Sequence, residues 1–504
     1  MDIRTKMLHK FITCSIIIVA SALILILSHF GVADSPDAMH YLGAAYNIVH
    51  TKSIDLPFGI WIHTPLTHFP PFYPLIVAFI SELIGVSVFT GARLLQALLL
   101  GCNIVVMIYV VQRMQLFSMK TSYLFGLYFL FSIPYVFIHV AATSEPVMLL
   151  FGQLAFLGLY EYLFKKKFLY ILVSILCLWC VTLTRYVGIA YPITIGIYLL
   201  FFTQSNSKTK LWYVGLVLAS VIPILSWVYW TYTVNGRVAN RVLLYHAIPI
   251  AGIQHAVSAL GSWVNQFDSI PSLFLVLFCL LVYGYFFKKR ALQKKNKFFD
   301  YVTNITKIFF LVYCTCVVIA LLFFDAAISL DARMILPLQG IGVIYIIGVL
   351  ARRFQFRKHS VLVYVFILIS LFYVWSFVQW AKTYWMNGYG YASAEWSKSG
   401  LFSYIQQLDK DAVIYSNSPQ LIFFYNQRNT YELPWKKSLT SGQQNIDYQE
   451  QITNVLHSIA HHQGWIIYFR GVSGSRLASE EEIASYPDVY PVFELPEGVV
   501  FGIK

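Results

Sequence analysis

The sequence predicts an α-helical multi-pass membrane protein with a small α/β domain at its C-terminal end. The 504-residue chain is 58% hydrophobic and only 12% charged, about half the charged share of an average soluble domain. Apolar stretches of roughly twenty residues, long enough to cross a hydrocarbon core, recur from Phe11 to Ala381. After Ala381 the chain becomes polar and its hydrophobic residues follow the periods of short helices and strands.

The first apolar stretch is interpreted as an uncleaved membrane helix. Arg4, Lys6 and Lys10 precede it, as in a signal peptide, but no small-residue cleavage site follows and further apolar stretches come after it. Its basic flank places the N-terminus in the cytoplasm.

The basic residues gather in short loops between the apolar stretches, which is the positive-inside pattern. The five loops 113–120, 165–167, 208–210, 288–297 and 352–358 are therefore predicted to be cytoplasmic. This topology explains the net charge of +13 without nucleic-acid binding. Two spans must separate successive loops, which gives about eleven spans and a C-terminus outside. The predicted spans are 11–31, 93–112, 121–142, 146–164, 168–184, 188–203, 211–231, 270–287, 305–324, 334–350 and 360–381.

Segment 70–87 is long enough for a short span, but counting it as one would move every later basic loop to the outer face. We therefore predict an interfacial helix there, inside a first outer loop over residues 32–92. Residues 1–384 then form the transmembrane domain.

Residues 385–504 are predicted to form the extracytoplasmic α/β domain. Helices are expected over 393–408 and 448–462, and strands over 412–417, 464–469, 489–495 and 499–504. The seven cysteines all lie in apolar stretches without the spacing of a zinc site, so they are interpreted as packing residues.

The first outer loop carries the leading candidate for chemistry. Pro36 suits the first turn of a helix on which Asp37 and Tyr41 share one face. Asp37 could act as a general base towards a hydroxyl. The alternative is that Asp34 and Asp37 are helix-start residues favoured by the helix dipole. Glu145, at the outer end of a span, is a costly carboxylate in an apolar setting and a second candidate, with a capping role as its alternative.

Four arginines, Arg185, Arg237, Arg241 and Arg333, are predicted outside against the positive-inside rule. A local salt bridge, such as Asp331 with Arg333, would explain any one of them. Four on one side favour an anionic ligand, because guanidinium groups bind phosphate in a forked geometry.

Two histidines of the first outer loop, His63 and His68, could contact a phosphate or a substrate hydroxyl. Zinc held with Asp37 is the weaker interpretation, since the spacing matches no ligand pattern. The need for a divalent metal stays open.

Taken together, these residues resemble the GT-C glycosyltransferases, in the group related to protein O-mannosyltransferases and to the bacterial aminoarabinose transferase that decorates lipid A. The resemblance spans residues 11–350. Its pieces are DAMHYLGAAYNI (37–48), THFPPFYP (67–74), GARLL (91–95), SEP (144–146), LTRYVG (183–188) and ARMILP (332–337).

The resemblance implies a sugar donor linked to a polyprenyl phosphate, presented on the outer leaflet of a plasma membrane, and a glycan, lipid or protein acceptor. It implies that Asp37 serves as base in an inverting transfer and that Glu145 is the second acid. Asp34, Tyr41 and the arginines are then expected at the substrate site. One branch of the family often has a lysine before the Pro-Pro step; here Phe69 stands there. Arg185, Arg333 or His68 are the candidates to replace its phosphate contact.

Three alternatives remain at this point. A transporter or flippase of lipid-linked sugars would share the groove and the basic residues, but it should show internal repeats and polar groups at mid-membrane. A ligase or polymerase of lipid-linked saccharides often has a larger arginine-rich outer loop. A non-catalytic assembly subunit would not need Asp37 together with Glu145.

Overall fold

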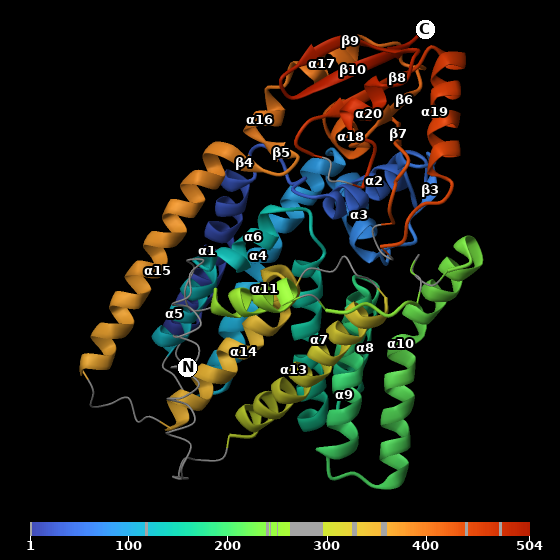
Figure 1. The fold of residues 1–504 in the computed structure, drawn as a ribbon. Coiled ribbons are helices and arrows are strands. Elements are labelled where there is room, and N and C mark those ends of the chain that lie inside the picture. Colours follow the sequence, from blue (N-terminus) through green and yellow to red (C-terminus); the bar gives the residue numbers. More distant parts are fainter. Residues whose placement is uncertain are drawn as a thin grey trace.

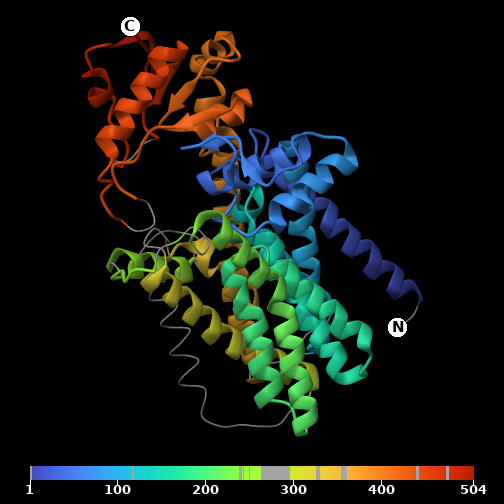
Figure 2. The ribbon, with the colours of Figure 1, turned by 90° about the vertical axis from the view of Figure 1, so that its right-hand side faces the viewer.

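The computed structural model describes residues 3–115, 119–237, 241, 243–248, 250–262, 296–324, 330–353, 360–438, 442–472 and 476–504. Figure 1 shows a lower layer of helices and an upper unit built around a β-sheet, with α2 and α3 between them. The same layering is visible after a quarter turn in Figure 2.

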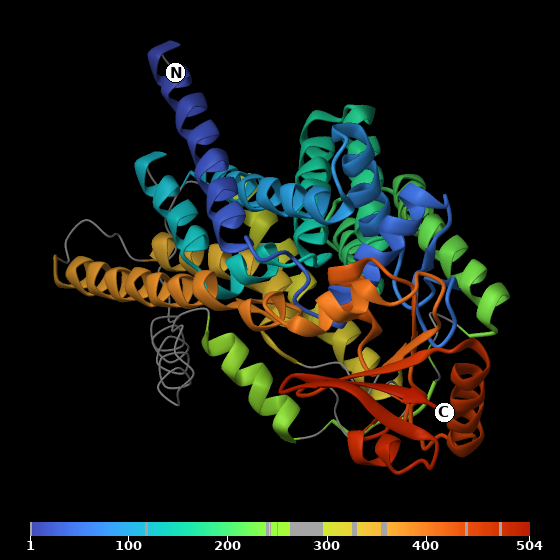
Figure 3. The ribbon, with the colours of Figure 1, turned by 90° about the horizontal axis from the view of Figure 1, so that it is seen from above.

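The lower layer consists of apolar helices of 8 to 29 residues packed around one hydrophobic core. They are α1 (Ile3–Leu27), α4 (Val88–Arg113), α5 (Met119–Leu130), α6 (Ile133–Val140), α7 (Glu145–Lys165), α8 (Phe168–Thr182), α9 (Ala190–Phe201), α10 (Ser207–Asn235), α11 (Ile250–Gly261), α13 (Lys297–Phe323), α14 (Ala332–Arg353) and α15 (Ser360–Asn387). Seen from above in Figure 3, the N-terminal end of α1 projects away from the other helices.

Five of the described helices are long and apolar enough to cross a membrane: α1, α4, α7, α10 and α13. The count of about eleven spans stays a prediction, and its span 270–287 lies outside the described residues. The predicted span 121–142 is not one straight helix. It divides into α5 and α6, which meet at an angle of 59°. Pro134 in the first turn of α6 accounts for the break, because proline has no N–H to continue the helical hydrogen bonds of α5.

The segment predicted to be the first outer loop, residues 32–92, contains the two helices α2 (Pro36–His50) and α3 (Phe72–Ile84). The hydroxyl of Ser35 accepts a hydrogen bond from the backbone N–H of Ala38 and caps α2, with Pro36 in the first turn. α3 is a helix of 13 residues. At 1.5 Å per residue it is about 20 Å long, shorter than a hydrocarbon core of about 30 Å. The predicted helix at 70–87 therefore exists but is too short to span.

The upper unit is a six-stranded sheet of order β2-β7-β6-β8-β10-β9. β2, β7, β6 and β8 are mutually parallel, while β10 pairs antiparallel with both β8 and β9. The strands are β2 (Phe58–Gly59), β6 (Ile414–Ser416), β7 (Thr430–Glu432), β8 (Trp465–Phe469), β9 (Val489–Leu495) and β10 (Gly498–Ile503). The strands predicted in the C-terminal region are confirmed, and β7 was not anticipated.

Helices cover both faces of this sheet. α17 (Gly400–Gln407) and α18 (Pro419–Asn426) contribute to one buried cluster, and α19 (Tyr448–His462) and α20 (Glu480–Ala484) contribute to the other. α19 matches the helix predicted over 448–462. The single helix predicted over 393–408 is instead two helices, α16 (Ala394–Ser397) and α17, because Ser399 caps a new start through the N–H of Leu401.

The sheet of the C-terminal region, residues 385–504, also takes in a strand from outside that range. Its edge strand β2 comes from the first outer loop, where Phe58 pairs in register with Thr430. One apolar cluster holds Leu42 of α2 together with Phe423 of α18. The sheet therefore rests directly on the helix that carries Asp37.

The short segment between α1 and α2 is held from both sides. The carbonyl of Val32 accepts a hydrogen bond from Ala142 N at 2.7 Å, and that of Ala33 accepts one from Ala392 N at 2.9 Å. Ala392 belongs to a hairpin formed by β4 (Gly388–Tyr389) and β5 (Ala392–Ser393). This clamp fixes where α2 begins.

Replacing Gly390 by alanine should loosen this clamp. Gly390 has φ +58°, and a Cβ built there would overlap the carbonyl oxygen of Asp34. We expect Gly390→Ala to destabilise the protein by on the order of 2 kcal/mol, seen as a melting temperature lower by several degrees. The matched control is Gly215→Ala in α10, where a Cβ meets nothing within 4 Å. Equal melting temperatures for the two variants would contradict the clamp.

Candidate active site

The centre of the site is Glu145, the first residue of α7. Its side chain is 2% exposed and accepts hydrogen bonds at Oε1 from Arg185 Nη1 at 2.6 Å and from Arg333 Nε. Among the described residues, its other oxygen, Oε2, is buried without a hydrogen-bond partner. A buried carboxylate needs paired cations, so Glu145 draws two arginines from distant parts of the chain to one point.

Asp37, in the first turn of α2, joins this cluster through Arg333. Arg333 Nη2 lies 2.7 Å from Asp37 Oδ2, and the side chain of Asp37 remains 40% exposed. Burial opposes ionisation of Asp37, but the charges of Arg333 and Arg185 outweigh it and hold its pKa below the ordinary value. Asp37 is therefore an ionised carboxylate with a free approach, as a base requires.

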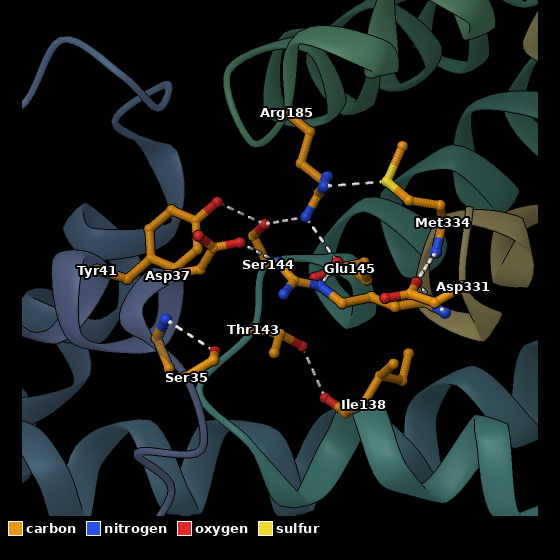
Figure 4. Close-up of polar contacts among 12 residues, drawn as sticks. Ser35, Asp37, Tyr41, Ile138, Thr143, Ser144, Glu145, Arg185, Asp331 and Met334 are labelled. Carbon is orange, nitrogen blue, oxygen red and sulfur yellow. Dashed lines mark hydrogen bonds and ion pairs between the residues drawn. The ribbon is translucent and has the colours of Figure 1, made fainter. Parts of the chain in front are cut away.

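Ser144 connects the remaining members of the cluster. Its hydroxyl lies 3.0 Å from Tyr41 OH and accepts a hydrogen bond from Arg185 Nη1 at 3.4 Å. Figure 4 shows Tyr41 and Asp37 facing Ser144, Glu145 and Arg185 from the opposite side. Tyr41 is fully buried one helical turn after Asp37, as the shared face predicted.

Backbone contacts hold the turn that carries Ser144 and Glu145. Gln96 Nε2 donates to the carbonyl of Thr143 at 2.7 Å, and Asn103 Nδ2 donates to that of Pro146 at 3.0 Å. Both donors lie on α4, which is buried between α1 and α7 and so provides a rigid support.

The two arginines are each positioned by the segment that carries them. Asp331 Oδ1 accepts the backbone N–H groups of Arg333 and Met334, so it caps α14 while the guanidinium of Arg333 reaches Asp37 and Glu145. Arg185 follows α8 and precedes a 3₁₀ turn, Tyr186–Ile189. The carbonyl of Leu183 accepts a hydrogen bond from Phe72 N at 2.9 Å, which ties this segment to the start of α3.

Asp34 lies at the edge of the cluster. Burial raises its pKa to about 6, against the opposing effects of the Ser35 hydrogen bond and the charge of Arg333. The two neighbouring aspartates thus have pKa values displaced in opposite directions, so that Asp37 is ionised at an acidic pH at which Asp34 is still protonated.

His68 and Arg241 form a separate pair beside the cluster. Arg241 Nη2 lies 3.3 Å from His68 Nε2, and its guanidinium carbon lies over the ring of Tyr186, 5.7 Å from the ring centre. Burial and the charge of Arg241 lower the pKa of His68 to about 3, so its imidazole is neutral at physiological pH. Arg237 is exposed after α10, and the described residues give it no ion pair with the cluster.

The predicted site residues therefore divide into three groups. Asp37, Tyr41, Glu145, Arg185 and Arg333 share one hydrogen-bonded cluster, with Asp34 at its edge. His68 and Arg241 adjoin it, and Arg237 does not. Ser144 and Gln96 were missed: Ser144 stands in the SEP motif, but nothing in the sequence signals that its hydroxyl bridges Tyr41 and Arg185.

The described residues contain no group of three or more His, Cys, Asp or Glu side chains that could hold a metal ion. The carboxylates of Asp37 and Glu145 are engaged by arginines instead. These residues do not fit a metal centre.

The displaced pKa of Asp34 predicts a pH-dependent stability. Because its folded pKa lies above the unfolded value, Asp34 favours folding only while protonated, and this contribution is lost as pH rises through about 6. Asp34→Asn should therefore melt at the same temperature as wild type below about pH 4 and at a higher temperature above about pH 7. There its free energy of unfolding should exceed that of wild type by roughly 1–3 kcal/mol. The control is Asp488→Asn on the surface. A constant difference between Asp34→Asn and wild type across this range would contradict the assignment.

Comparison with known proteins places this geometry in a family context. The family model of dolichyl-phosphate-mannose-protein mannosyltransferases matches residues 68–230. No curated protein sequence matches the chain significantly.

Several solved structures share the fold. ArnT from Cupriavidus metallidurans in the apo state has a TM-score of 0.58 and 13% identity over 98% of both chains. The structure of ArnT bound to undecaprenyl phosphate has a TM-score of 0.52 and 12% sequence identity over 97% of both chains. The oligosaccharyltransferase of Archaeoglobus fulgidus in complex with Zn and sulfate has a TM-score of 0.51 and 11% sequence identity. The match covers 90% of this chain and 68% of the oligosaccharyltransferase chain. The chain therefore shares its fold with ArnT and with the archaeal oligosaccharyltransferase, and about a third of it matches the mannosyltransferase family model.

Proposed function

We propose that this protein transfers a sugar from a polyprenyl-phosphate donor to a hydroxyl group of an acceptor on the outer face of the plasma membrane. One observation carries the proposal: the accessible carboxylate of Asp37 is bonded to Arg333, which shares the buried Glu145 with Arg185. A base and a pair of phosphate-binding groups thus stand side by side. The ArnT structure bound to undecaprenyl phosphate supports a donor of this class.

The two guanidinium groups are proposed to bind the donor phosphate. Each guanidinium has five N–H donors in a planar fork, and the hydrogen bonds described above use only part of them. As the bond between the anomeric carbon and the phosphate oxygen breaks, negative charge grows on the leaving phosphate. Positioned cations in a site shielded from water stabilise that charge.

Asp37 is proposed as the general base. Its carboxylate takes the proton of the acceptor hydroxyl while the hydroxyl oxygen attacks the anomeric carbon. One bond forms, the bond to phosphate breaks, and polyprenyl phosphate leaves with the bonding electrons. A single displacement of this kind inverts the anomeric centre.

Glu145 is proposed to act through the arginines. Its carboxylate is covered by both guanidinium groups and is almost inaccessible. It therefore fits a positioning residue that holds the phosphate clamp at a fixed separation, instead of the second catalytic acid expected from the sequence.

The orientation proposed from the charge pattern puts the N-terminus in the cytoplasm and the C-terminal sheet outside. The cluster lies between α2 of the first outer loop and the starts of α7 and α14, at the end of the helical layer nearest the sheet (Figure 1). A lipid tail would then lie along the apolar helices while its headgroup reaches the arginines. The acceptor is a glycan, a lipid or a protein.

Asp37→Asn should abolish transfer. The amide keeps the size and a hydrogen bond to Arg333 but cannot accept a proton, so we expect turnover to fall by about 10²–10⁴-fold. The assay is release of polyprenyl phosphate from a panel of polyprenyl-phosphate sugars by purified protein in vesicles. Full activity of Asp37→Asn would exclude this base. A transporter or flippase would move the donor without releasing polyprenyl phosphate, which distinguishes that alternative.

Lysine substitutions test the phosphate clamp. Arg185→Lys and Arg333→Lys keep the charge but remove the fork, so the apparent KM for the lipid donor should rise by about tenfold or more. Arg476→Lys, an exposed position of the C-terminal region, is the control. An unchanged donor KM in both clamp variants would remove the arginines from the mechanism.

A further inference from the structure

A cavity lies outside the carboxylate–arginine cluster, between the first outer loop and the outer end of α10. It has a volume of about 450 Å³ and is lined by Ser53, Ile54, Asp55, His63, Pro65, Trp227 and Trp230. Figures 1 and 3 show the outer end of α10 beside the loop that carries β3 (Thr64–Pro65). A cavity of this size accommodates a small ligand, and nothing in the proposed chemistry uses it.

One wall of the cavity is a fixed carboxylate–imidazole pair. Asp55 Oδ2 lies 3.0 Å from His63 Nδ1. The other oxygen, Oδ1, accepts hydrogen bonds from Asn47 Nδ2 and Ser53 Oγ, both at 2.7 Å. Because Asp55 holds Nδ1, the opposite ring nitrogen of His63 is left to face outward, and the side chain is 54% exposed.

The backbone at His63 is held in a conformation that L-residues rarely adopt. His63 has φ +63°, in the left-handed region that a non-glycine residue occupies at an energetic cost. The hydrogen bond from His63 N to the carbonyl of Leu56 and the pairing of Leu56 with Thr64 maintain it. Such strain is found preferentially at ligand sites, and here it aims the imidazole at the cavity.

The facing wall is a pair of tryptophans on α10. The rings of Trp227 and Trp230 lie 4.5 Å apart at 32°. Trp227 is only 9% exposed, and its Nε1 donates inward to Tyr186 OH at 3.2 Å. Tryptophans that anchor a protein in the membrane interface place their rings among lipid headgroups. This pair instead faces a carboxylate and an imidazole.

A chain of contacts links the cavity to the proposed reaction centre. Tyr186, which receives the Trp227 hydrogen bond, donates to the carbonyl of Thr67 and lies beneath Arg241. Arg241 contacts His68, and the charge of Asp37 acts on the pKa of His68. Asn47, bonded to Asp55, is ten residues after Asp37 on α2, a distance of about 15 Å along the helix. None of the residues that line the cavity belongs to the carboxylate–arginine cluster, so the cavity is distinct from the proposed reaction centre.

We propose that this cavity binds a sugar ring of the acceptor, at a distance from the hydroxyl that reacts. The apolar C–H face of a pyranose ring packs against an aromatic surface, here Trp227 and Trp230, while its hydroxyl groups hydrogen-bond with His63 and Asp55. A mostly aromatic wall with a few fixed polar groups is the usual construction of such a pocket. As an acceptor subsite the inference rests on the proposed function, and among acceptors it favours a glycan or glycolipid.

Binding can be measured without any transfer reaction. Protein labelled with 5-fluorotryptophan in lipid nanodiscs is titrated with maltotriose, mannotriose or chitotriose, and the ¹⁹F resonances of Trp227 and Trp230 are assigned from their Phe variants. We expect a saturable shift of these two resonances with at least one trisaccharide. Tri(ethylene glycol), which has no ring, should cause none, and Trp212 at the other end of α10 should not respond.

Two substitutions test the residues. His63→Gly removes the imidazole at a position whose φ suits glycine, so the fold is retained, and Trp230→Ala removes half of the aromatic wall. Each should weaken trisaccharide binding by about tenfold or more, read on Trp227. Absence of any saturable shift in wild type, or unchanged affinity in both variants, would overturn the inference. The binding titration contains no sugar donor, so it is independent of the transfer reaction. If the saccharide binds but the transfer assay shows no activity, the proposed function is overturned and the pocket is not.

Discussion

The burial of the Glu145 carboxylate is the constraint on which the site depends. A charge removed from water must be neutralised, and Arg185 and Arg333 do so from two separate segments. α7, the turn after α8 and the start of α14 are thereby fixed against one another. Since Arg333 also reaches Asp37, the same interaction determines where the first outer loop presents its accessible carboxylate.

The C-terminal sheet contributes to the site through support and not through a catalytic group of its own. It shares a hydrophobic cluster with α2, takes its edge strand from the first outer loop, and clamps the segment before α2 through Ala392. Phe58 of β2 also packs edge-on against His40, one turn after Asp37. The polar C-terminal sheet and the apolar helical layer therefore form one continuous structure around Asp37.

The sequence predicted the parts of this structure that depend on local chemistry. Pro36 after Ser35 marked the start of α2, and arginines that violate the positive-inside rule marked Arg185 and Arg333 as partners of an anion. The sequence could not predict long-range pairing. Arg333 contacts Asp37, which is 296 positions away, and no periodicity encodes such a contact. The hydroxyl bridge of Ser144, the strained φ of His63 and the recruitment of β2 likewise depend on neighbours that only the fold brings together. The bend at Pro134 was visible in principle, but a helix-breaking proline is tolerated in apolar segments and so gave no certain signal.

The pairing of Phe58 with Thr430 also bears on the order in which the protein is made. A ribosome releases the first outer loop long before the strands beside it exist, and closing so distant a contact is slow. During that interval the short edge segment has no partner, and the start of α2 lacks the brace from Ala392. The helix that carries Asp37 consequently gains these supports only after residues 392 and 430 have been synthesised.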